Sequence, residues 1–519
     1  MTTTTTSTTT ATTSATTAPA TDKPASAPGG EAAVVAGRGA LFIGFAKVYF
    51  MLSGFLQQVL LTRLVGLRDY GAFGVVNNVI SIVNNTVVQG TIQSISKFTA
   101  EDDHRAGAVQ RAGLRMQVGV GAALGLGFFL GAPWLAAFEK QPAYAGYFRI
   151  AAAIPFLYAL YAVFVGSANG LRRFRAQAGF DVGFSTAKTV LLLGGAILWK
   201  VTGAFFGFAA AAVFILIVAA RVMRLPPATD TPAFPSARLG RYMGAVVAYS
   251  FLLNVALNYD QPLLHHFAGV VDAQAAGVVA AHYQALRTLA LLPYQALVVV
   301  TFVMFPLVSR ATFAEDQAVT RAYVTQTLRY ALILAAGMGL TLAARPGALL
   351  GILYKPEYGD GALALPTLVA GECCLALLSV SCAILNAAGR TRATLVLMAL
   401  TVVVGGGAAA TMVPAALPGR PMLLAAALAT TLGNAVGLAV AIAVVRRRLG
   451  GSPPLATVAR VALAIGVVVL VGRFVPPGGK LLGLVVTLVL AALYVAVLVA
   501  SGEFGPADRA KVARILRRR

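Results

Sequence analysis

Charged residues are scarce in this sequence, and their scarcity excludes a soluble globular protein. Only 11% of the 519 residues are Asp, Glu, Lys or Arg, whereas soluble domains carry about 25%. Hydrophobic residues make up 58% of the chain, and the mean hydropathy is +0.79. This composition is typical of a protein embedded in a membrane.

Motifs of enzyme chemistry are also missing. The sequence has no Walker A loop, no Gly-x-Ser-x-Gly motif and only four histidines, so it predicts neither ATP hydrolysis nor a His-rich metal site. Three cysteines, Cys373, Cys374 and Cys382, share one apolar segment without a partner at metal-ligand spacing. We interpret them as small packing residues. We predict no catalytic residue, no metal ligand and no cofactor, hence no enzyme.

The two ends of the chain lack long apolar runs. Residues 1–36 are rich in Thr, Ala and Pro and have no apolar core of a signal peptide. Because such a segment buries too little surface to fold, we predict a disordered cytoplasmic tail. Residues 503–519 predict a basic cytoplasmic tail, whose part 506–519 is suited to an amphipathic helix on an anionic membrane surface.

Between these ends, the chain carries long apolar blocks. A hydrocarbon core about 30 Å thick needs roughly 20 apolar residues per helix, and only helices suit such runs in lipid. The sequence therefore predicts an all-α, polytopic membrane protein with about fourteen transmembrane helices. The blocks lie near 41–66, 70–95, 115–138, 147–170, 179–199, 203–223, 242–268, 274–304, 322–345, 363–388, 392–414, 422–445, 455–475 and 480–500.

The basic residues are distributed unevenly along the chain. There are 41 Lys and Arg against 18 Asp and Glu, and most of the cations fall in the tails and in every second loop. This is the positive-inside pattern of a protein with both termini in the cytoplasm. A nucleic-acid surface would need clustered cations with aromatic or base-reading partners, which the sequence lacks, so we predict no nucleic acid partner.

The two halves of the chain share landmarks in the same order. Residues 94–103 resemble 306–316, and residues 167–173 resemble 385–392. Six helices per half put both halves into the membrane in the same sense. We therefore predict two six-helix lobes related by a pseudo-twofold axis along the membrane normal, with the binding site between them. The predicted parts are lobes at 37–230 and 231–450, and two extra helices at 451–502.

Amide side chains recur on one face of two predicted helices. One face of block 70–95 carries Asn78, Asn85, Gln89, Gln93 and Ser96; one face of block 242–268 carries Ser250, Asn254, Asn258, Gln261 and His265. Gln58 adds an amide to the first block. Polar residues also join helices to one another, but a ladder of this length supplies more donors and acceptors than helix contacts require. These faces predict a hydrated cavity.

Five charged residues were identified within the predicted spans: Lys47, Lys188 and Arg287, with Asp260 and Glu372. Charges at this depth usually face a cavity or pair with each other. Structural ion pairs are therefore one interpretation. The other is a site for an anionic passenger, since Arg grips phosphate bidentately and Lys acts as a point charge. Asp260 and Glu372 are candidates for coupling to a sodium or proton gradient.

Several short motifs resemble a known family. They are Lys47 in the first block, residues 61–66 (LTRLVG), Tyr70-Gly71, residues 96–101 (SKFTAE), residues 169–174 (NGLRRF) and residues 502–508 (GEFGPAD). The chain resembles bacterial polysaccharide transporters, the Wzx-type flippases of the multidrug/oligosaccharidyl-lipid/polysaccharide (MOP) superfamily. The resemblance implies a bacterial inner-membrane protein with fourteen helices in two lobes around a cationic cavity.

The resemblance also implies a function. A flippase of this type moves an undecaprenyl-pyrophosphate-linked oligosaccharide to the outer leaflet by alternating access, for cell-surface polysaccharide or O-antigen synthesis. The expected partners are the lipid-linked glycan, membrane lipids, and a polysaccharide polymerase with chain-length proteins. The diphosphate would meet Lys47 and Arg287. The sugars would meet amides, and the expected binding residues are Lys47, Gln58, Asn78, Asn85, Gln89, Asn254, Asn258 and Arg287.

Three alternatives stay open. An ion-coupled multidrug antiporter on the same scaffold would depend on Asp260 and Glu372. A lipid II flippase would share the scaffold, although that branch has several Arg where block 70–95 has amides. A non-transporting membrane scaffold for glycan assembly would tolerate changes to the cavity residues.

Overall fold

The computed structural model describes residues 30–225, 233–298, 316–475 and 479–505. Every regular element in these ranges is a helix, which confirms the all-α prediction. The first half contains α1 (Gly30–Leu64), α2 (Leu67–Glu101), η1 (Asp103–Arg105), α3 (Ala106–Phe138), α4 (Tyr144–Ala151), α5 (Ala153–Gly170) and α6 (Phe174–Val222). Helix α1 begins at Gly30, within the range 1–36 predicted as a tail; residues 1–29 lie outside the described part, and the tail stays a prediction.

Helix α6 is a hairpin of two helical arms. The backbone leaves helical geometry at Trp199 and Lys200, and Lys200 has a positive φ of 50°. The arms pack so closely that a side chain on Gly203 would collide with the Gly195 carbonyl. The predicted blocks 179–199 and 203–223 are therefore the two arms, with the turn where the apolar pattern is interrupted.

The second half contains more elements than the apolar blocks predict. It runs through α7 (Ser236–Asn258), α8 (Asp260–Val271), α9 (Ala273–Ala290), α11 (Gln317–Ala343), α12 (Pro346–Leu353), η2 (Pro356–Leu363), α13 (Leu365–Ala387), α14 (Thr391–Met412), α15 (Arg420–Leu449), α16 (Leu455–Phe474) and α17 (Lys480–Ala500). Block 242–268 is divided between α7 and α8, so the expectation of one continuous helix there is wrong. The landmark at 306–316 lies outside the described residues, except for Asp316.

Eleven described helices are long and apolar enough to cross a membrane. A twelfth span arises if α11 and α12, which meet at a bend of 76°, count as one. The hairpin α6 enters this count as a single helix, and block 274–304 is described only to residue 298. The polytopic membrane architecture is confirmed, whereas the number fourteen stays a prediction.

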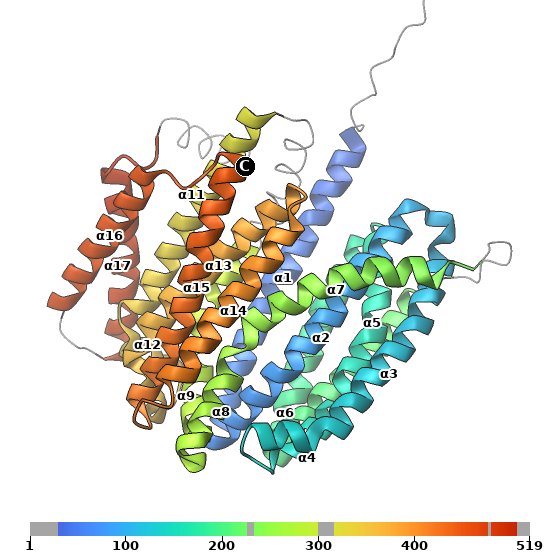
Figure 1. Cartoon of the computed structure of the whole chain (residues 1–519), viewed down its shortest axis with the longest axis horizontal. Coiled ribbons are helices and arrows are strands. Elements are labelled where there is room, and N and C mark those ends of the chain that lie inside the picture. Colours follow the sequence, from blue (N-terminus) through green and yellow to red (C-terminus); the bar gives the residue numbers. More distant parts are fainter. Residues whose placement is uncertain (1–29, 226–232, 299–315, 476–478, 506–519) are drawn as a thin grey trace, which may run out of the picture.

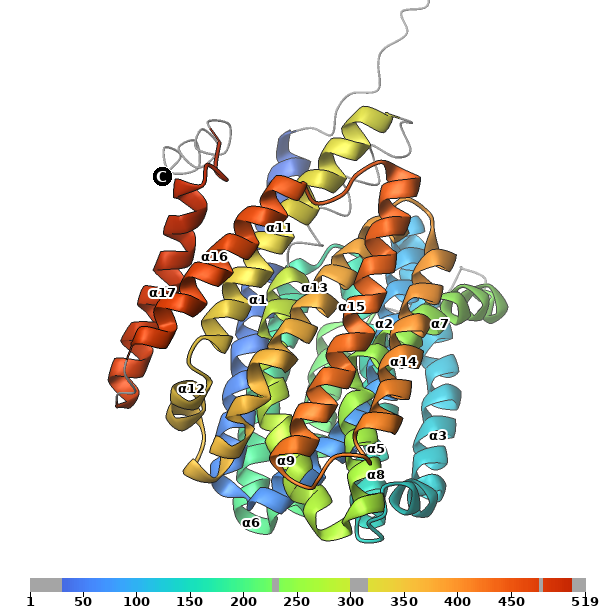
Figure 2. The same cartoon turned by 60° about the vertical axis from the view of Figure 1, so that its left-hand side comes forward.

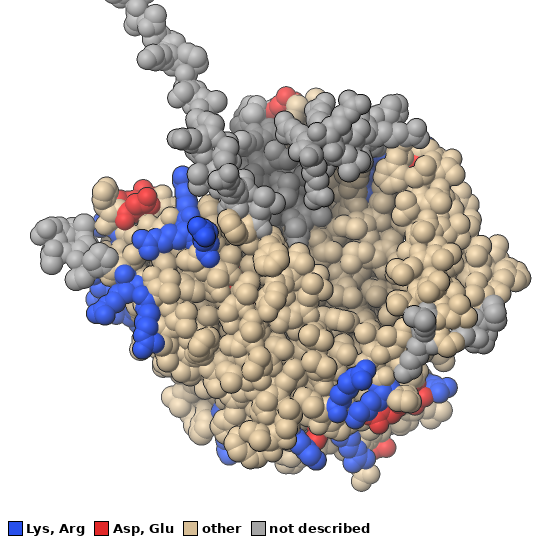
Figure 3. Space-filling model, turned by 180° about the vertical axis from the view of Figure 1, so that it is seen from behind, with Lys and Arg blue, Asp and Glu red and all other residues tan. Residues whose placement is uncertain are grey.

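The helices form two groups that lie side by side (Figures 1 and 2). We call the face where α1 begins and α17 ends the upper face, and the opposite one, with the α8–α9 turn and α4, the lower face (Figure 1). Figure 3 shows charged residues gathered at two opposite ends of the molecule, with a broad band of other residues between them. Because lipid tails exclude unpaired charge, this band is the part suited to the hydrocarbon core.

Helix α7 does not stay with the second group. Near its start, Arg238 pairs with Glu101 at the end of α2, and Val247 packs on Gly90 of α2. Near its end, α7 contacts α14 of the second group. The predicted lobe boundary at 230/231 assigns all of α7 to the second lobe; the first half of α7 contacts α2 of the first group, and the boundary stays a prediction.

Candidate functional site

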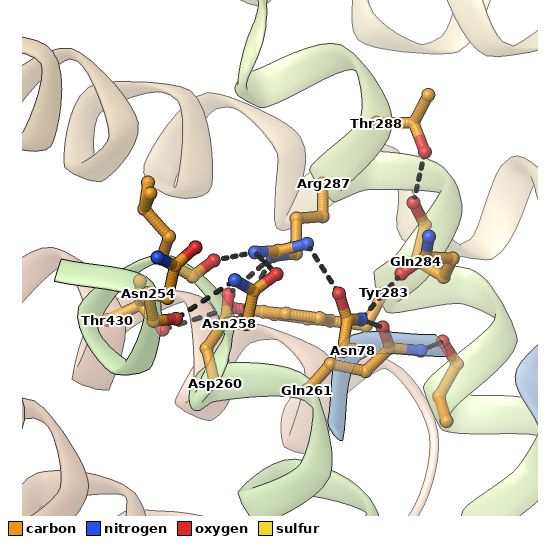
Figure 4. Close-up of polar contacts among 12 residues, drawn as sticks. Asn78, Asn254, Asn258, Asp260, Gln261, Tyr283, Gln284, Arg287, Thr288 and Thr430 are labelled. Carbon is orange, nitrogen blue, oxygen red and sulfur yellow. Dashed lines mark hydrogen bonds and ion pairs between the residues drawn. The ribbon is translucent and has the colours of Figure 1, made fainter. Parts of the chain in front are cut away.

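The break between α7 and α8 creates the polar centre of the molecule. Pro262 has no N–H to donate to the Asn258 carbonyl, and its ring crowds that carbonyl, so the helix cannot continue unbroken. Asn258 ends α7 and Asp260 begins α8, with Tyr259 between them. Carbonyl groups in the last turn of α7 and a carboxylate at the start of α8 thus face the same region (Figure 4).

Arg287 of α9 fills this break. Its Nε lies 3.1 Å from Asp260 Oδ1, and its Nη2 donates to the Leu257 carbonyl and, at 3.4 Å, to Asn258 Oδ1. The Arg287 side chain is only 6% exposed. The guanidinium therefore satisfies groups that the broken helix leaves free and is itself neutralised by a buried carboxylate.

Asn78 of α2 joins the first group of helices to this centre. Its Oδ1 accepts from Arg287 Nη1 at 3.2 Å, while its Nδ2 donates to Gln261 Oε1 and, at 3.2 Å, to Gln284 Oε1. Asn78 is 2% exposed. One amide thus ties α2 to α8 and α9 across the two groups (Figure 4).

The carboxylates of the centre outnumber its cation. Asp260 also accepts from the Tyr283 hydroxyl at 3.0 Å, and Tyr283 contacts Thr430 of α15 at 3.0 Å. Glu372 of α13 is 2% exposed, its Oε2 has no hydrogen-bond partner among the described residues, and it interacts electrostatically with Asp260 and Arg287. Two carboxyl groups beside one guanidinium require a proton or a metal cation to reach neutrality.

Above Asn78, the amide face of α2 is open. Asn85, Gln89 and Gln93 lie on the same helical face as Asn78, toward the upper face, and all three are exposed. Because Asn78 on this face meets α8 and α9, the exposed amides point toward the space between the two groups. The exposed part of the ladder is thus limited to its upper residues, and the hydrated cavity stays a prediction.

Lys47 lies away from Arg287's contacts. Its ammonium pairs with Asp181 of α6 at 2.8 Å, and 40% of the Lys47 side chain is exposed. Ser53, further along α1, contacts Thr189 of α6 at 2.9 Å. Polar contacts thus line the seam between α1 and α6. The sequence analysis missed Asp181 as an acid within a span, although it lies in block 179–199.

The remaining candidates have mixed surroundings. Gln58 accepts from the Tyr70 hydroxyl at 3.3 Å. Asn254 is buried, and its amide donates to the Ser250 carbonyl one turn earlier at 2.8 Å, so that amide nitrogen serves the helix itself. Lys188 has its Nζ 4.0 Å from the centre of the Phe208 ring. The structure gathers Asn78, Asn258, Asp260 and Arg287 into one network.

A second buried polar cluster joins the two groups at the lower face. His265 of α8 contacts Glu139, just after α3, with 2.7 Å between Nδ1 and Oε2, and the two side chains are 0% and 2% exposed. Tyr144 of α4 lies 3.2 Å from His265 Nε2, and Gln141 donates to the Ala273 carbonyl at 2.8 Å. We call Glu139, Gln141, Tyr144, His265 and Ala273 the lower latch. The sequence did not single out Glu139, because it lies outside the apolar blocks.

The His, Cys, Asp and Glu side chains do not gather into threes in the part of the chain that the structure describes. There, no group of three or more His, Cys, Asp or Glu side chains is arranged to hold a metal ion. The three cysteines are free; Cys382 is buried, and Cys373 and Cys374 are partly buried in α13. Cys373 contacts the Ala335 carbonyl of α11 at 3.3 Å, a packing position between two helices.

Comparisons with known proteins identify the family. A family model described as polysaccharide biosynthesis protein matches residues 36–312, which is just over half of the 519 residues. No curated protein sequence matches the chain. Solved structures match at low identity, so they speak for the fold alone.

Two of these structures match this chain over nearly their whole length. One is the lipid II flippase MurJ in an inward closed conformation, with a TM-score of 0.68, 11% identity, and coverage of 89% of this chain and 98% of that one. The other is a multidrug resistance MATE family transporter of the MOP superfamily in an inward-facing conformation, with a TM-score of 0.65, 16% identity, and coverage of 77% and 94%. A MOP superfamily transporter from Pyrococcus furiosus matches with a TM-score of 0.59, 16% identity, and coverage of 79% and 95%. The chain therefore belongs to the polysaccharide biosynthesis protein family and has the fold of the MOP superfamily.

Proposed function

We propose that this protein is a flippase that moves an undecaprenyl-pyrophosphate-linked oligosaccharide across the bacterial cytoplasmic membrane by alternating access. The observation that carries the proposal is the exposed amide face of α2, with Asn85, Gln89 and Gln93. Neutral amides that stay wet inside a membrane bundle suit sugar hydroxyls, which both donate and accept hydrogen bonds. The family match to polysaccharide biosynthesis proteins supports the same substrate class.

The described contacts favour an arrangement closed at the lower face. The lower latch joins the two groups there, while the amide face of α2 is exposed toward the upper face. With the termini in the cytoplasm, as the positive-inside pattern predicts, the sugars would enter from the cytoplasmic side. Opening of the latch would then release them on the other side.

Arg287 is the residue that would receive the diphosphate. In the present arrangement Asp260 occupies the guanidinium, so a phosphate oxygen must displace that carboxylate. A proton or a sodium ion on Asp260 would weaken the pair and free the guanidinium's donors. The coupling ion would thus act on the Asp260 side of the ion pair, and the diphosphate on its Arg287 side.

Glycan display on the cell surface tests the role of the amides. We expect the triple variant with Asn85→Ala, Gln89→Ala and Gln93→Ala to lose display at normal expression, since each lost sugar hydrogen bond costs about 0.5–1.5 kcal/mol. Gln274→Ala is a matched control, because Gln274 is an exposed amide at the lower face. Full display in the triple variant would contradict the proposal.

A second experiment distinguishes diphosphate binding by Arg287 from its structural pairing with Asp260. Arg287→Ala alone leaves Asp260 buried without its partner, so loss of display could reflect misfolding. The double variant Arg287→Gln with Asp260→Asn is neutral and keeps hydrogen-bonding groups. We expect it to fold and still fail in display; restored display would reduce Arg287 to a structural role. Lys47→Ala, tested alongside, probes the second cation.

An ion-coupled multidrug antiporter is the second candidate. The orphaned Oε2 of Glu372 beside Asp260 and Arg287 favours it, since antiporters need a carboxyl that takes up and releases a cation. In a drug-efflux assay, this function predicts sensitivity to Asp260→Asn and Glu372→Gln but not to Lys47→Ala. Loss of glycan display without any change in efflux would leave the flippase as the explanation.

A further inference from the structure

A groove opens at the upper face, away from the polar centre, where three helix ends meet. It has a volume of about 610 Å³ and lies between the first turns of α11, the start of α16 and the segment after α17. Figure 2 shows these ends beside one another at the edge of the bundle. The polar lining residues are Arg321, Thr325, Gln326, Arg329, Thr457, Arg460 and Glu503.

Glu503 forms the floor of the groove. Its side chain is fully buried and accepts from Arg329 Nε at 2.6 Å, from Arg460 Nη1 at 3.0 Å and from the Thr457 hydroxyl at 2.7 Å. Burial acts to raise the pKa of Glu503, but these hydrogen bonds outweigh it and hold the pKa below the usual value. The carboxylate thus fixes two guanidinium groups in place.

Among the described residues, the lining of the groove carries more positive charge than its one carboxylate neutralises. Three arginines face one acid. Arg321 forms no hydrogen bond or ion pair with any residue that the structure describes, and 36% of the Arg460 side chain is exposed. The side chain of Arg321 also lies against Gly450, the C-cap of α15, whose last turn carries three further arginines at 446–448. The local excess of guanidinium groups calls for an anion.

The surroundings of the groove indicate which anion. Helix α16 leaves the groove with apolar side chains exposed along its length, including Leu455 at 85% and Leu463 at 56%. These residues suit acyl chains, and the groove lies at the helix ends, the level of lipid head groups. Basic pockets between helices on the cytoplasmic side are known to hold anionic head groups.

We propose that this groove binds the phosphate of an anionic diacyl phospholipid of the cytoplasmic leaflet, with Arg321 and Arg460 as its ligands. Each guanidinium has five N–H donors, so Arg460 can hold Glu503 and a phosphate oxygen together. The lipid would tie α11 to the hairpin of α16 and α17. The site is separate from Arg287 and does not depend on the flippase function.

The test uses the purified full-length protein and native mass spectrometry with phosphatidylglycerol as the probe. We expect retention of this lipid in the wild type and at least about tenfold weaker retention in Arg321→Gln with Arg460→Gln, because one charged hydrogen bond corresponds to tenfold or more. Arg390→Gln with Arg392→Gln is the matched control, since both are exposed arginines elsewhere on the upper face.

Four outcomes would overturn the proposal. Equal retention of phosphatidylglycerol by the wild type and the Arg321/Arg460 variant would show that the lipid binds outside this groove. Equal retention of phosphatidylcholine would show that the charge plays no part. Displacement by inorganic phosphate at the same concentration as by the lipid would reveal an adventitious anion only, and preferential displacement by undecaprenyl phosphate would assign the groove to the cargo instead.

Discussion

The lower latch offers a direct test of alternating access. His265→Ala removes one partner of a buried pair and leaves the Glu139 carboxyl without its hydrogen bond, at 2% exposure. Breaking a buried pair in this way costs about 3–5 kcal/mol. The cost falls on the latched arrangement alone, because an open latch exposes Glu139 to water. We therefore expect the open arrangement to gain population.

The size of that gain follows from the same figure. At 1.4 kcal/mol per factor of ten, the balance between latched and open arrangements should shift by roughly 100- to 4000-fold. By contrast, Arg238 and Glu101 are 58% and 40% exposed, and such a surface pair is worth at most about 1 kcal/mol. Arg238→Ala is therefore the control for simple loss of an ion pair.

Cysteine labelling measures the change. Ala268 lies one turn after His265 in α8 and is 1% exposed. In a background with Ala268→Cys, an impermeant maleimide added from the lower face should react much faster after His265→Ala than after Arg238→Ala. Unchanged labelling would refute the latch, because a buried contact that can be removed at no cost to closure does not hold the two groups together.

Other predictions concern pH, packing and the buried pair. Burial raises the pKa of Glu139, against the lowering effect of His265. A raised pKa means that the latched form binds the proton more tightly, so labelling of Ala268→Cys should increase as the pH rises from the ordinary Glu pKa of about 4.5 through the raised pKa of Glu139. Glu139→Gln should remove this dependence. Gly71→Ala should lower the free energy of unfolding by about 1–3 kcal/mol, since its Cβ would collide with the Gly277 carbonyl; thermal unfolding against Gly54→Ala, where the space is open, checks this. Arg287→Ala should cost about 3–5 kcal/mol, whereas Arg287→Met with Asp260→Leu should be nearly neutral, as denaturation of the purified protein would show.

Local patterns in the sequence predicted the positions of the helices better than the contacts between the helices. Apolar length located the spans, because each must cross a bilayer of fixed thickness, and the amide period placed Asn78 and Asn85 on one face. Their different surroundings could not be predicted, since Asn78 meets α8 and α9 while Asn85 is exposed. Burial along one face depends on how far the two groups of helices have closed.

The missed features arise from contacts between distant residues. Lys47 and Asp181 are 134 positions apart in sequence numbering, and no periodic pattern connects them, so the ion pair needed the fold. The break at Tyr259 had a local signal in Pro262, which forbids a continuous helix; the apolar pattern of block 242–268 concealed it. Apolar content identifies membrane helices but does not require them to be unbroken.

In the proposed flippase, the break at Tyr259 and the charges around it would act in one mechanism. A continuous helix would use the Leu257 carbonyl itself, whereas the broken one offers that carbonyl to Arg287 together with Asp260. A cation on Asp260 weakens the hold on Arg287, and an anion on Arg287 weakens the hold on Asp260, so each ligand raises the affinity of the other by the same factor. The diphosphate should consequently bind more tightly with sodium or protons present, and Asp260→Asn should abolish that dependence while leaving binding itself. A binding affinity independent of both ions in the wild type would separate the two ligands and leave Asp260 as a structural partner of Arg287.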